Sequence, residues 1–298
     1  WGYSAGVIGY SLIDSAYEKH AAYIGGVYLL SFIVVLTNVV IAQVLLLQLK
    51  QQKKLFLNAP MLVPTFLFLA IVLCYGFFAE RPSDKDATYL RVAVIGSVLS
   101  TEASVTEAGY RSYRKKLTEA FQHEPDLIVL PENVFPYFEL REEDSTLVEN
   151  TLVNFPNRNA LYADHTMLSR THSATTIALG IHTTKYGKVY NSVVFIKNGT
   201  PLGYYQKRVL VPFTEYAPFG LPIPLAVRFS KGANEQYFNV GGVKASALVC
   251  SEIADTNIRM SNTSIIIAPS NDSVFEGEYA APMHTSMARM RAVEQRAY

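Results

Sequence analysis

Three residues that could take part in nucleophilic catalysis each follow a short apolar run typical of a strand. Cys250 follows one such run and has a carboxylate two residues later. Glu132 and Lys207 follow two others. A cysteine at the exit of a buried strand can act as a nucleophile, because the strand delivers its thiol to a turn. A cysteine in this position is also often an inert buried residue, so the two further polar strand ends are what favour a catalytic interpretation.

The elements that would position these residues begin after residue 88. The run Leu90–Gly96 is typical of a strand, Thr106–Gln122 of an amphipathic helix and Leu127–Leu130 of a strand, which together predict a β-α-β unit. The pairs Asn198-Gly199 and Gly241-Gly242 predict two hairpins. Further strands are predicted at 175–180, 189–196, 202–206, 236–240, 245–249 and 265–268, and helices at 158–171 and 283–297. This order predicts a mixed sheet layered with helices.

The part of the chain before residue 80 has the pattern of membrane helices. No charged residue occurs from 21 to 49, and the run 24–47 is long enough to cross a hydrocarbon core. The run 59–79 is also uncharged and predicts a second span. The connector Lys50–Lys54 carries three lysines, so the positive-inside tendency places it in the cytoplasm and the rest of the chain on the other side. We therefore expect an extracytoplasmic or interfacial segment at 1–20, a membrane region at 21–79, a polar linker at 80–88 and a catalytic domain at 89–298.

Composition limits the classes of partner. The chain has 298 residues, half of them hydrophobic, and a formal net charge of +1, so nothing favours a nucleic acid as a partner. Its two cysteines, Cys74 and Cys250, exclude a disulfide framework and a cysteine-rich metal site. The sequence contains no His, Cys and Asp cluster with metal-binding spacing and no glycine-rich phosphate loop. We therefore expect neither a metal nor a cofactor.

Longer motifs surround the three candidate residues. The segments Lys207-Arg-Val-Leu-Val-Pro-Phe-Thr-Glu-Tyr-Ala-Pro218, Pro269-Ser-Asn-Asp-Ser-Val-Phe275 and Met287-Ala-Arg-Met-Arg-Ala-Val-Glu294 resemble motifs of the bacterial apolipoprotein N-acyltransferases, which belong to the nitrilase or carbon-nitrogen hydrolase superfamily. The resemblance implies an α/β fold, a nitrilase-like αββα sandwich preceded by transmembrane α-helices. It also implies a fragment, because family members carry further spans before this region and further strands after it.

The same resemblance implies the roles of the three residues. Glu132 would be the general base, which takes the thiol proton and later the proton of an attacking amine. Lys207 would stand beside the nucleophile, where its charge favours the thiolate and the oxyanion. Cys250 would be the nucleophile and would carry the acyl group as a thioester, which stays reactive enough to be passed to an amine.

Four further residues are implied to have supporting or substrate-binding roles. Glu215 corresponds to the family's additional active-site glutamate and would orient Lys207 or the substrate amine. Glu252 would help to place the substrate, with a helix cap or a salt bridge as the alternative. Asn271 lies in the later motif, as a structural or a catalytic residue. Ser251 stands where family members usually have an aromatic residue.

The resemblance implies a multi-pass acyltransferase of the bacterial cytoplasmic (inner) membrane, with its catalytic domain on the extracytoplasmic, periplasmic side. Cys250 would take a fatty acyl chain from a phospholipid and pass it to the N-terminal amine of a diacylglyceryl-cysteine apolipoprotein, the last step of lipoprotein maturation. Two alternatives stay open. One is a membrane-tethered amidase that uses the same three residues on a small amide, and the other is a catalytically silent homologue that binds lipid or lipoprotein.

Overall fold

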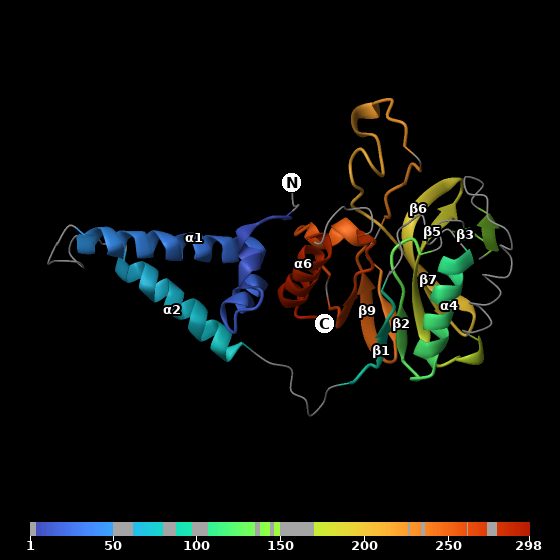
Figure 1. Cartoon of the computed structure of the whole chain (residues 1–298), viewed down its shortest axis with the longest axis horizontal. Helices are drawn as coiled ribbons and strands as arrows, with labels where there is room; N and C mark the ends of the chain where they lie inside the picture. Colours follow the sequence, from blue (N-terminus) through green and yellow to red (C-terminus); the bar gives the residue numbers. More distant parts are fainter. Residues whose placement is uncertain are drawn as a thin grey trace. The chain divides into compact units, whose positions relative to one another are not determined.

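The structure is a computed structural model, shown in Figure 1. It describes residues 4–49, 62–79, 88–96, 107–134, 138–143, 146–149, 170–225, 227–233, 236–260, 262–272 and 279–298. Contacts divide the chain into two compact units: a helical unit, residues 1–87 with 282–298, and a sheet unit, residues 88–281. The predicted connector at 50–54, nearly all of the predicted linker and most of the predicted helix at 158–171 lie outside the described residues.

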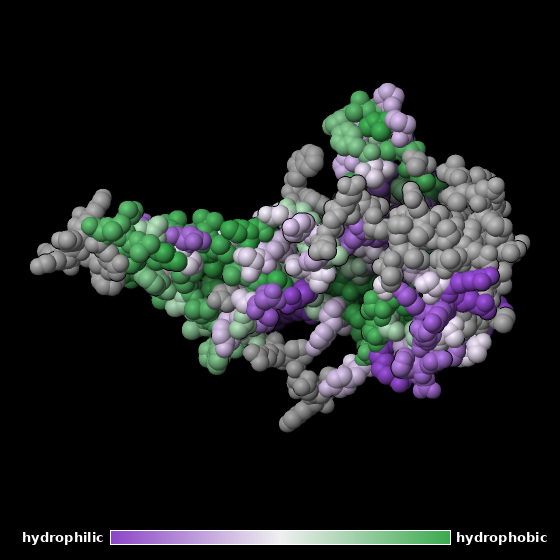
Figure 2. All heavy atoms as spheres, viewed as in Figure 1, coloured by the Kyte–Doolittle hydropathy of each residue, from purple (hydrophilic) through white to green (hydrophobic). Residues whose placement is uncertain are grey.

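The helical unit contains apolar helices. Its elements are η1 (Ile8–Leu12), η2 (Glu18–Ala21), α1 (Ala22–Leu49), α2 (Leu62–Phe78) and, from its third residue, α6 (Ala280–Gln295). α1 is long and apolar enough to cross a membrane, as the sequence predicts. α2 is apolar but has 17 residues, and its role as a second span stays a prediction. Large apolar side chains such as Phe32, Leu45 and Phe66 are exposed, which is typical of helices that meet lipid (Figure 2).

A buried carboxylate lies at a break in α1. Gly26 has a left-handed conformation (φ 66°) that interrupts the helix. The Val27 N–H, which opens the continuing helix, donates a hydrogen bond of 2.8 Å to Oε1 of Glu294 from α6. Arg291, one turn earlier on α6, forms a buried ion pair with the same carboxylate. The break therefore leaves no orphan N–H at this point, because α6 supplies the acceptor.

Within its described residues, the sheet unit has two sheets and an α-helix that covers the larger one. Its strands are β1 (Val92–Val94), β2 (Leu127–Val129), β3 (Phe138–Arg141), β4 (Thr146–Glu149), β5 (Thr176–Lys185), β6 (Lys188–Lys197), β7 (Thr200–Gln206), β8 (Phe238–Val240), β9 (Val243–Ala247) and β10 (Ile265–Ile267). The helices are α4 (Glu107–Phe121), η4 (Pro218–Gly220) and η5 (Cys250–Ala254).

The long strand β5 organises the larger sheet. One edge of β5 pairs in parallel with β2 along its first part and with β3 along its second part. Its other edge pairs with β6 in antiparallel register from Thr176 to Lys185, and β7 continues the meander. β1 is parallel to β2, and β4 is antiparallel to β3. The smaller sheet has the order β10-β9-β8, with β10 parallel to β9.

Two hydrophobic clusters hold these layers together. The first joins the apolar stripe of α4, which includes Leu117 and Phe121, to one face of the larger sheet. The second lies between the two sheets, where Phe195 of β6 stacks on Phe238 of β8 with ring centroids 3.9 Å apart. A helix packed on two facing sheets agrees with the predicted α/β sandwich.

The structure adds strands that the sequence pattern did not predict. β5 continues five residues beyond the predicted end at Gly180, through a turn at Tyr186-Gly187 into β6. The hairpin of β3 and β4 was not predicted at all. The hairpins at Asn198-Gly199 and Gly241-Gly242 are confirmed, and all four of their turn residues have positive φ.

Candidate active site

The structure brings Glu132, Lys207 and Cys250 together inside the sheet unit. Glu132 follows β2, Lys207 follows β7 and Cys250 opens η5 after β9, so each stands at the exit of a strand as predicted. The Cys250 thiol and the Glu132 carboxylate lie close enough for each to shift the pKa of the other, and the charge of Lys207 acts on both groups. Glu132 and Lys207 are buried, Lys207 to 1% exposure. The predicted nucleophile, base and cation therefore form one constellation, which is the geometry that base-assisted nucleophilic catalysis needs.

A tight turn holds the nucleophile. Cys250 has a left-handed backbone conformation (φ 49°), which is uncommon for a residue with a side chain and is often found at functional sites. Its N–H donates to the carbonyl of Pro269 at 2.9 Å, which fixes the turn to the chain that follows β10. Ser270 lies beside the Cys250 side chain, and its hydroxyl donates to Asp272 at 2.9 Å.

Neighbouring backbone and amide groups fix the Glu132 carboxylate. Oε1 accepts a hydrogen bond of 2.8 Å from the Asn191 side chain, and Oε2 accepts one of 3.1 Å from the Asn271 backbone N–H. A Cβ on Gly180 would lie 2.7 Å from the Glu132 Cα, so only glycine lets β5 run this close to the carboxylate. Burial raises the pKa of Glu132, against the opposing effects of Lys207 and of the Asn191 hydrogen bond.

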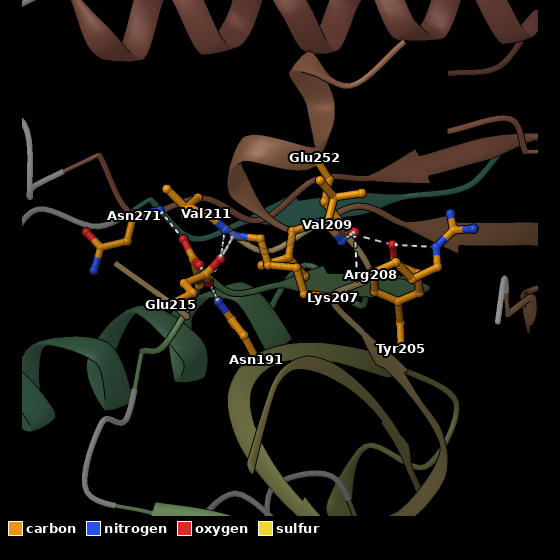
Figure 3. A network of polar contacts seen from close by, with 11 residues as sticks. Asn191, Tyr205, Lys207, Arg208, Val209, Val211, Glu215, Glu252 and Asn271 are labelled. Carbon is orange, nitrogen blue, oxygen red and sulfur yellow. Dashed lines mark hydrogen bonds and ion pairs between the residues drawn. The ribbon is translucent and has the colours of Figure 1, made fainter. Parts of the chain in front are cut away.

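Glu215 holds the Lys207 ammonium in place. Nζ of Lys207 lies 3.0 Å from each of the two carboxylate oxygens of Glu215 (Figure 3). Glu215 Oε2 also accepts the Val211 N–H at 2.7 Å. Burial acts to lower the pKa of Lys207, but Glu132 and Glu215 outweigh it and leave that pKa raised. Lys207 is therefore a fixed positive charge, and of the two roles predicted for Glu215 the geometry favours orientation of the lysine.

The thiol is protonated in the resting site. Burial, reinforced by the negative charge of Glu132, raises the pKa of Cys250 to about 12, and Lys207 only partly offsets this. A buried thiol with such a pKa becomes a strong nucleophile only when a base removes its proton during attack. Glu132 lies beside the thiol and is placed to be that base.

Glu252 has a different position from the one predicted for a substrate-binding residue. Its side chain is fully buried (0% exposed), and its oxygens accept N–H groups of Val249 at 2.8 Å, Arg208 at 2.7 Å and Val209 at 3.1 Å. The Tyr205 hydroxyl donates to it at 2.9 Å (Figure 3). Because these groups occupy both oxygens, the geometry favours the helix-cap alternative. Glu252 also joins the Cys250 turn to the chain beside Lys207, and we call this link the clamp.

The remaining predicted residues lie near the site in different ways. Asn271 reaches Glu132 through its backbone N–H. Ser251 is half-buried next to the nucleophile, and its role stays a prediction.

His182 is buried on β5, where burial lowers the pKa of its imidazole to about 4, so it is neutral at ordinary pH. Within the part of the chain that the structure describes, no group of three or more His, Cys, Asp or Glu side chains could hold a metal ion.

Sequence reasoning missed Asn191 and Gly180, both of which contact Glu132. Each stands inside a strand and looks like an ordinary strand residue. A glycine within a strand can mark a close backbone approach, and that signal was available at Gly180. Nothing local distinguishes Asn191, because its partners lie 24 and 59 residues away.

A comparison with known families agrees with this site. The model of the carbon-nitrogen hydrolase family matches residues 91–298. The chain belongs to this family. Membership of the carbon-nitrogen hydrolases accounts for the α/β sandwich, and the matched region contains Glu132, Lys207 and Cys250.

The chain is also similar to proteins named apolipoprotein N-acyltransferase. It is 26% identical over 302 residues to the one from Aquifex aeolicus, which covers 97% of this chain and 61% of that protein. It is 31% identical over 191 residues to the one from Allorhizobium ampelinum, which covers 59% of this chain and 34% of that protein. The one from Haemophilus influenzae is 27% identical over 96% of this chain and 56% of its own length. The chain thus spans little more than half the length of the relatives that it matches almost end to end.

Among solved structures, the chain is similar to a carbon-nitrogen hydrolase superfamily protein from Xanthomonas campestris with an arsenic adduct in its active site. The TM-score is 0.47 and the identity 20%, over 71% of this chain and 74% of that chain.

Proposed function

We propose that this chain is the catalytic part of a membrane acyltransferase. The enzyme moves a fatty acyl chain from a phospholipid, through a thioester on Cys250, to the N-terminal amine of a diacylglyceryl-cysteine apolipoprotein. The observation that carries the proposal is the buried constellation in which Cys250 lies beside Glu132 and the fixed charge of Lys207. The names of the relatives support the choice of acyl transfer and of the two substrates.

The first half-reaction forms the thioester. Glu132 takes the thiol proton as Sγ of Cys250 attacks the ester carbonyl carbon of the phospholipid. The Lys207 ammonium stabilises the oxyanion that forms on the carbonyl oxygen. The tetrahedral intermediate then breaks its C–O bond to the glycerol oxygen, and this oxygen takes the proton from Glu132. The acyl group stays on sulfur, and a lysophospholipid leaves.

The second half-reaction forms the amide. The neutral amine of the apolipoprotein attacks the thioester carbonyl carbon, and Glu132 accepts a proton from the amine nitrogen. The C–S bond breaks, the sulfur takes that proton back, and the thiol is restored. A thioester suits this step, because it is activated enough to acylate an amine. Burial raises the pKa of Glu132 above that of an exposed glutamate, which makes the carboxylate a stronger base toward the thiol and the amine.

Apolar surface supports a lipid substrate. The chain that carries Glu215 continues into an irregular loop that projects from the sheets (Figures 1 and 2). In this loop Phe213 and Leu221 are exposed and Phe219 is 96% exposed. Large apolar side chains on one exposed loop are characteristic of a surface that meets lipid or another apolar partner. Together with the apolar helix α1, the loop favours bilayer substrates over a small soluble amide.

The proposal includes a location. A site that takes acyl chains from phospholipid and passes them to lipid-anchored proteins has to work at the bilayer surface, and α1 provides a membrane anchor. We place the site on the extracytoplasmic side of the bacterial cytoplasmic membrane, because the lysine-rich segment 50–54 favours the cytoplasm for the other end of α1.

Mass spectrometry of the protein incubated with phospholipid tests the proposal. We expect a hydroxylamine-sensitive acyl adduct on the peptide that contains Cys250, and no adduct in the Cys250→Ala variant. Cys74, the other cysteine, provides the matched control, so the Cys74→Ala variant should keep the adduct. Addition of a diacylglyceryl peptide with a free amine should discharge the adduct and yield the N-acylated peptide.

Two other outcomes would overturn the proposal. If no phospholipid gives an adduct while the protein releases ammonia from small amides, the chain is a membrane-tethered amidase. If neither reaction occurs while lipid or lipoprotein still binds, the chain is a catalytically silent homologue.

A further inference from the structure

Asn191 joins the two carboxylates of the site. It lies on β6, is 4% exposed, and its backbone carbonyl accepts the Lys207 N–H at 2.8 Å. Its side-chain nitrogen lies 2.8 Å from Oε1 of Glu132 and 3.0 Å from Oε1 of Glu215. Figure 3 shows the amide pointing toward Glu215 from the strand below. Because an amide NH2 group has two hydrogens, it can donate one to each carboxylate.

The two carboxylates have to be kept in different roles. Two carboxylates at one site repel each other when both are ionised, and one of them then tends to hold a proton. Lys207 pairs with both oxygens of Glu215, so Glu215 already has a charged partner. Glu132 has to ionise with the help of hydrogen bonds to its own oxygens, and Asn191 supplies one of them. An amide can do this for both glutamates without adding charge.

The orientation of the amide follows from its neighbours. If the amide were turned over, its oxygen would face two carboxylates and no hydrogen would reach either. In the observed orientation Oδ1 is buried and has no hydrogen-bond partner among the described residues. A buried acceptor without a partner costs free energy, so Asn191 is a poor choice for stability alone. This cost is understandable if the two donated hydrogen bonds serve the site.

We propose that Asn191 is a positioning residue of the active site, which fixes Glu132 and Glu215 relative to each other and helps to keep Glu132 ionised as the base for Cys250. This proposal deepens the proposed function, and it rests on that function for the role of Glu132 as the base that takes the proton of Cys250.

The groups that face Glu132 set the direction of the expected effect. Lys207, Glu215 and Cys250 all lie around its carboxylate, and His182 stands near Glu215 as a neutral imidazole. Burial raises the pKa of Glu132, while Lys207 and the Asn191 hydrogen bond lower it. Loss of the Asn191 donor therefore raises the pKa of Glu132 further and moves its ionisation to higher pH.

Alkylation of Cys250 tests the proposal without any substrate. The rate of reaction with iodoacetamide is measured against pH in a Cys74→Ala background, so that a single thiol reports. In the wild type the rate should rise with pH as Glu132 ionises and begins to accept the thiol proton. The Asn191→Leu variant keeps the size of the side chain but has no hydrogen-bond donor. Its rise in alkylation rate should lie about one pH unit higher than in the wild type. At pH values below this rise, its alkylation rate should be about tenfold lower than that of the wild type. Asn257→Leu, at an exposed asparagine, is the matched control and should leave the profile in place.

A conservative variant separates positioning from folding. Asn191→Ser keeps one hydroxyl donor and should give a smaller shift than Asn191→Leu; it decides the question if the leucine variant does not fold. An unchanged pH profile in a folded Asn191 variant overturns the proposal and leaves Asn191 with a structural role. If the profile shifts as expected but no acyl adduct forms from phospholipid, the role of Asn191 stands and the proposed acyl transfer fails.

Discussion

Replacement of Glu252 by glutamine should weaken both the fold and the site. The carboxylate accepts two backbone N–H groups on Oε1, from Arg208 and Val209, and the Val249 N–H with the Tyr205 hydroxyl on Oε2. A glutamine has one acceptor oxygen and one NH2 group. Whichever way it is placed, the NH2 group meets at least one backbone N–H, and that donor is left buried without an acceptor.

The size of the effect follows from this count. Hydrogen bonds to a charged acceptor contribute about 1.5–3 kcal/mol each, and at least one is lost while the others become neutral. We therefore expect the free energy of unfolding to fall by about 2–4 kcal/mol. For a chain of this length this corresponds to a fall in Tm of roughly 3–6 °C. The Cys250 turn and the chain beside Lys207 also lose their link, so thioester formation should slow about 10-fold to 100-fold, as expected for a misplaced catalytic group.

Two assays and one control check this prediction. Thermal unfolding of the detergent-solubilised protein measures stability, and single-turnover formation of the Cys250 adduct from phospholipid measures the chemistry. Glu119→Gln is the matched control, because Glu119 is 56% exposed and lies 3.8 Å from Lys115 in a surface pair. Such surface pairs contribute little, so this variant should match the wild type within about 0.5 kcal/mol. A Glu252→Gln protein with wild-type Tm and wild-type adduct formation would refute the clamp.

Three further predictions concern other parts of the chain. Gly180→Ala should slow formation of the Cys250 adduct while lowering Tm only slightly, because the new Cβ would lie 2.7 Å from the Glu132 Cα and would displace the base. A variant that forms the adduct at the wild-type rate would contradict this prediction. Burial lowers the pKa of His182 from 6.5 to about 4, so the unfolded chain binds a proton that the native chain does not between these pH values. As the pH drops from 7 to 4, the free energy of unfolding should therefore fall by roughly 3 kcal/mol more in the wild type than in His182→Gln. The same dependence of this free energy on pH in both proteins would contradict the prediction. Glu294→Ala leaves the Val27 N–H and the buried Arg291 without their carboxylate, so the free energy of unfolding should fall by about 3–5 kcal/mol in thermal unfolding. A fall of less than about 1 kcal/mol would show that Glu294 does not stabilise the break in α1.

The sequence alone predicted the parts of the site that have local signals. Glu132, Lys207 and Cys250 each follow a short apolar strand, so their positions could be found from periodicity, and the resemblance to a family connected them. The hairpin turns were predictable because Asn198-Gly199 and Gly241-Gly242 readily adopt the left-handed conformations that tight turns need.

The parts that were missed depend on contacts between distant segments. The β3–β4 hairpin has a charged sequence around Glu142 and Glu143 and little apolar alternation, and β3 pairs with the far half of β5. The end of β5 was placed too early because Gly180 looks like a strand terminator, although here glycine allows the close approach of the Glu132 turn. The sequence left the role of Glu252 open between substrate placement and a helix cap or salt bridge, because its oxygens accept N–H groups more than 40 residues away as well as one of its own turn.

The two buried glutamates explain how an irregular segment can hold a catalytic lysine. After β7 the Lys207 N–H still donates to β6, but the chain from Arg208 to Glu215 leaves the sheet, so its backbone N–H groups lose the partners that a strand ladder would give them. Glu252 accepts the N–H groups of Arg208 and Val209 near the start of this segment, and Glu215 accepts the Val211 N–H and the lysine side chain from its end.

Glu215 and Glu252 are both buried, whereas Phe219 in the same irregular loop as Glu215 is 96% exposed. The ammonium of Lys207 is therefore held by one buried carboxylate, Glu215, and the backbone that follows the lysine is held by another, Glu252. In the proposed reaction, these two carboxylates keep the Lys207 charge in place beside the thiol.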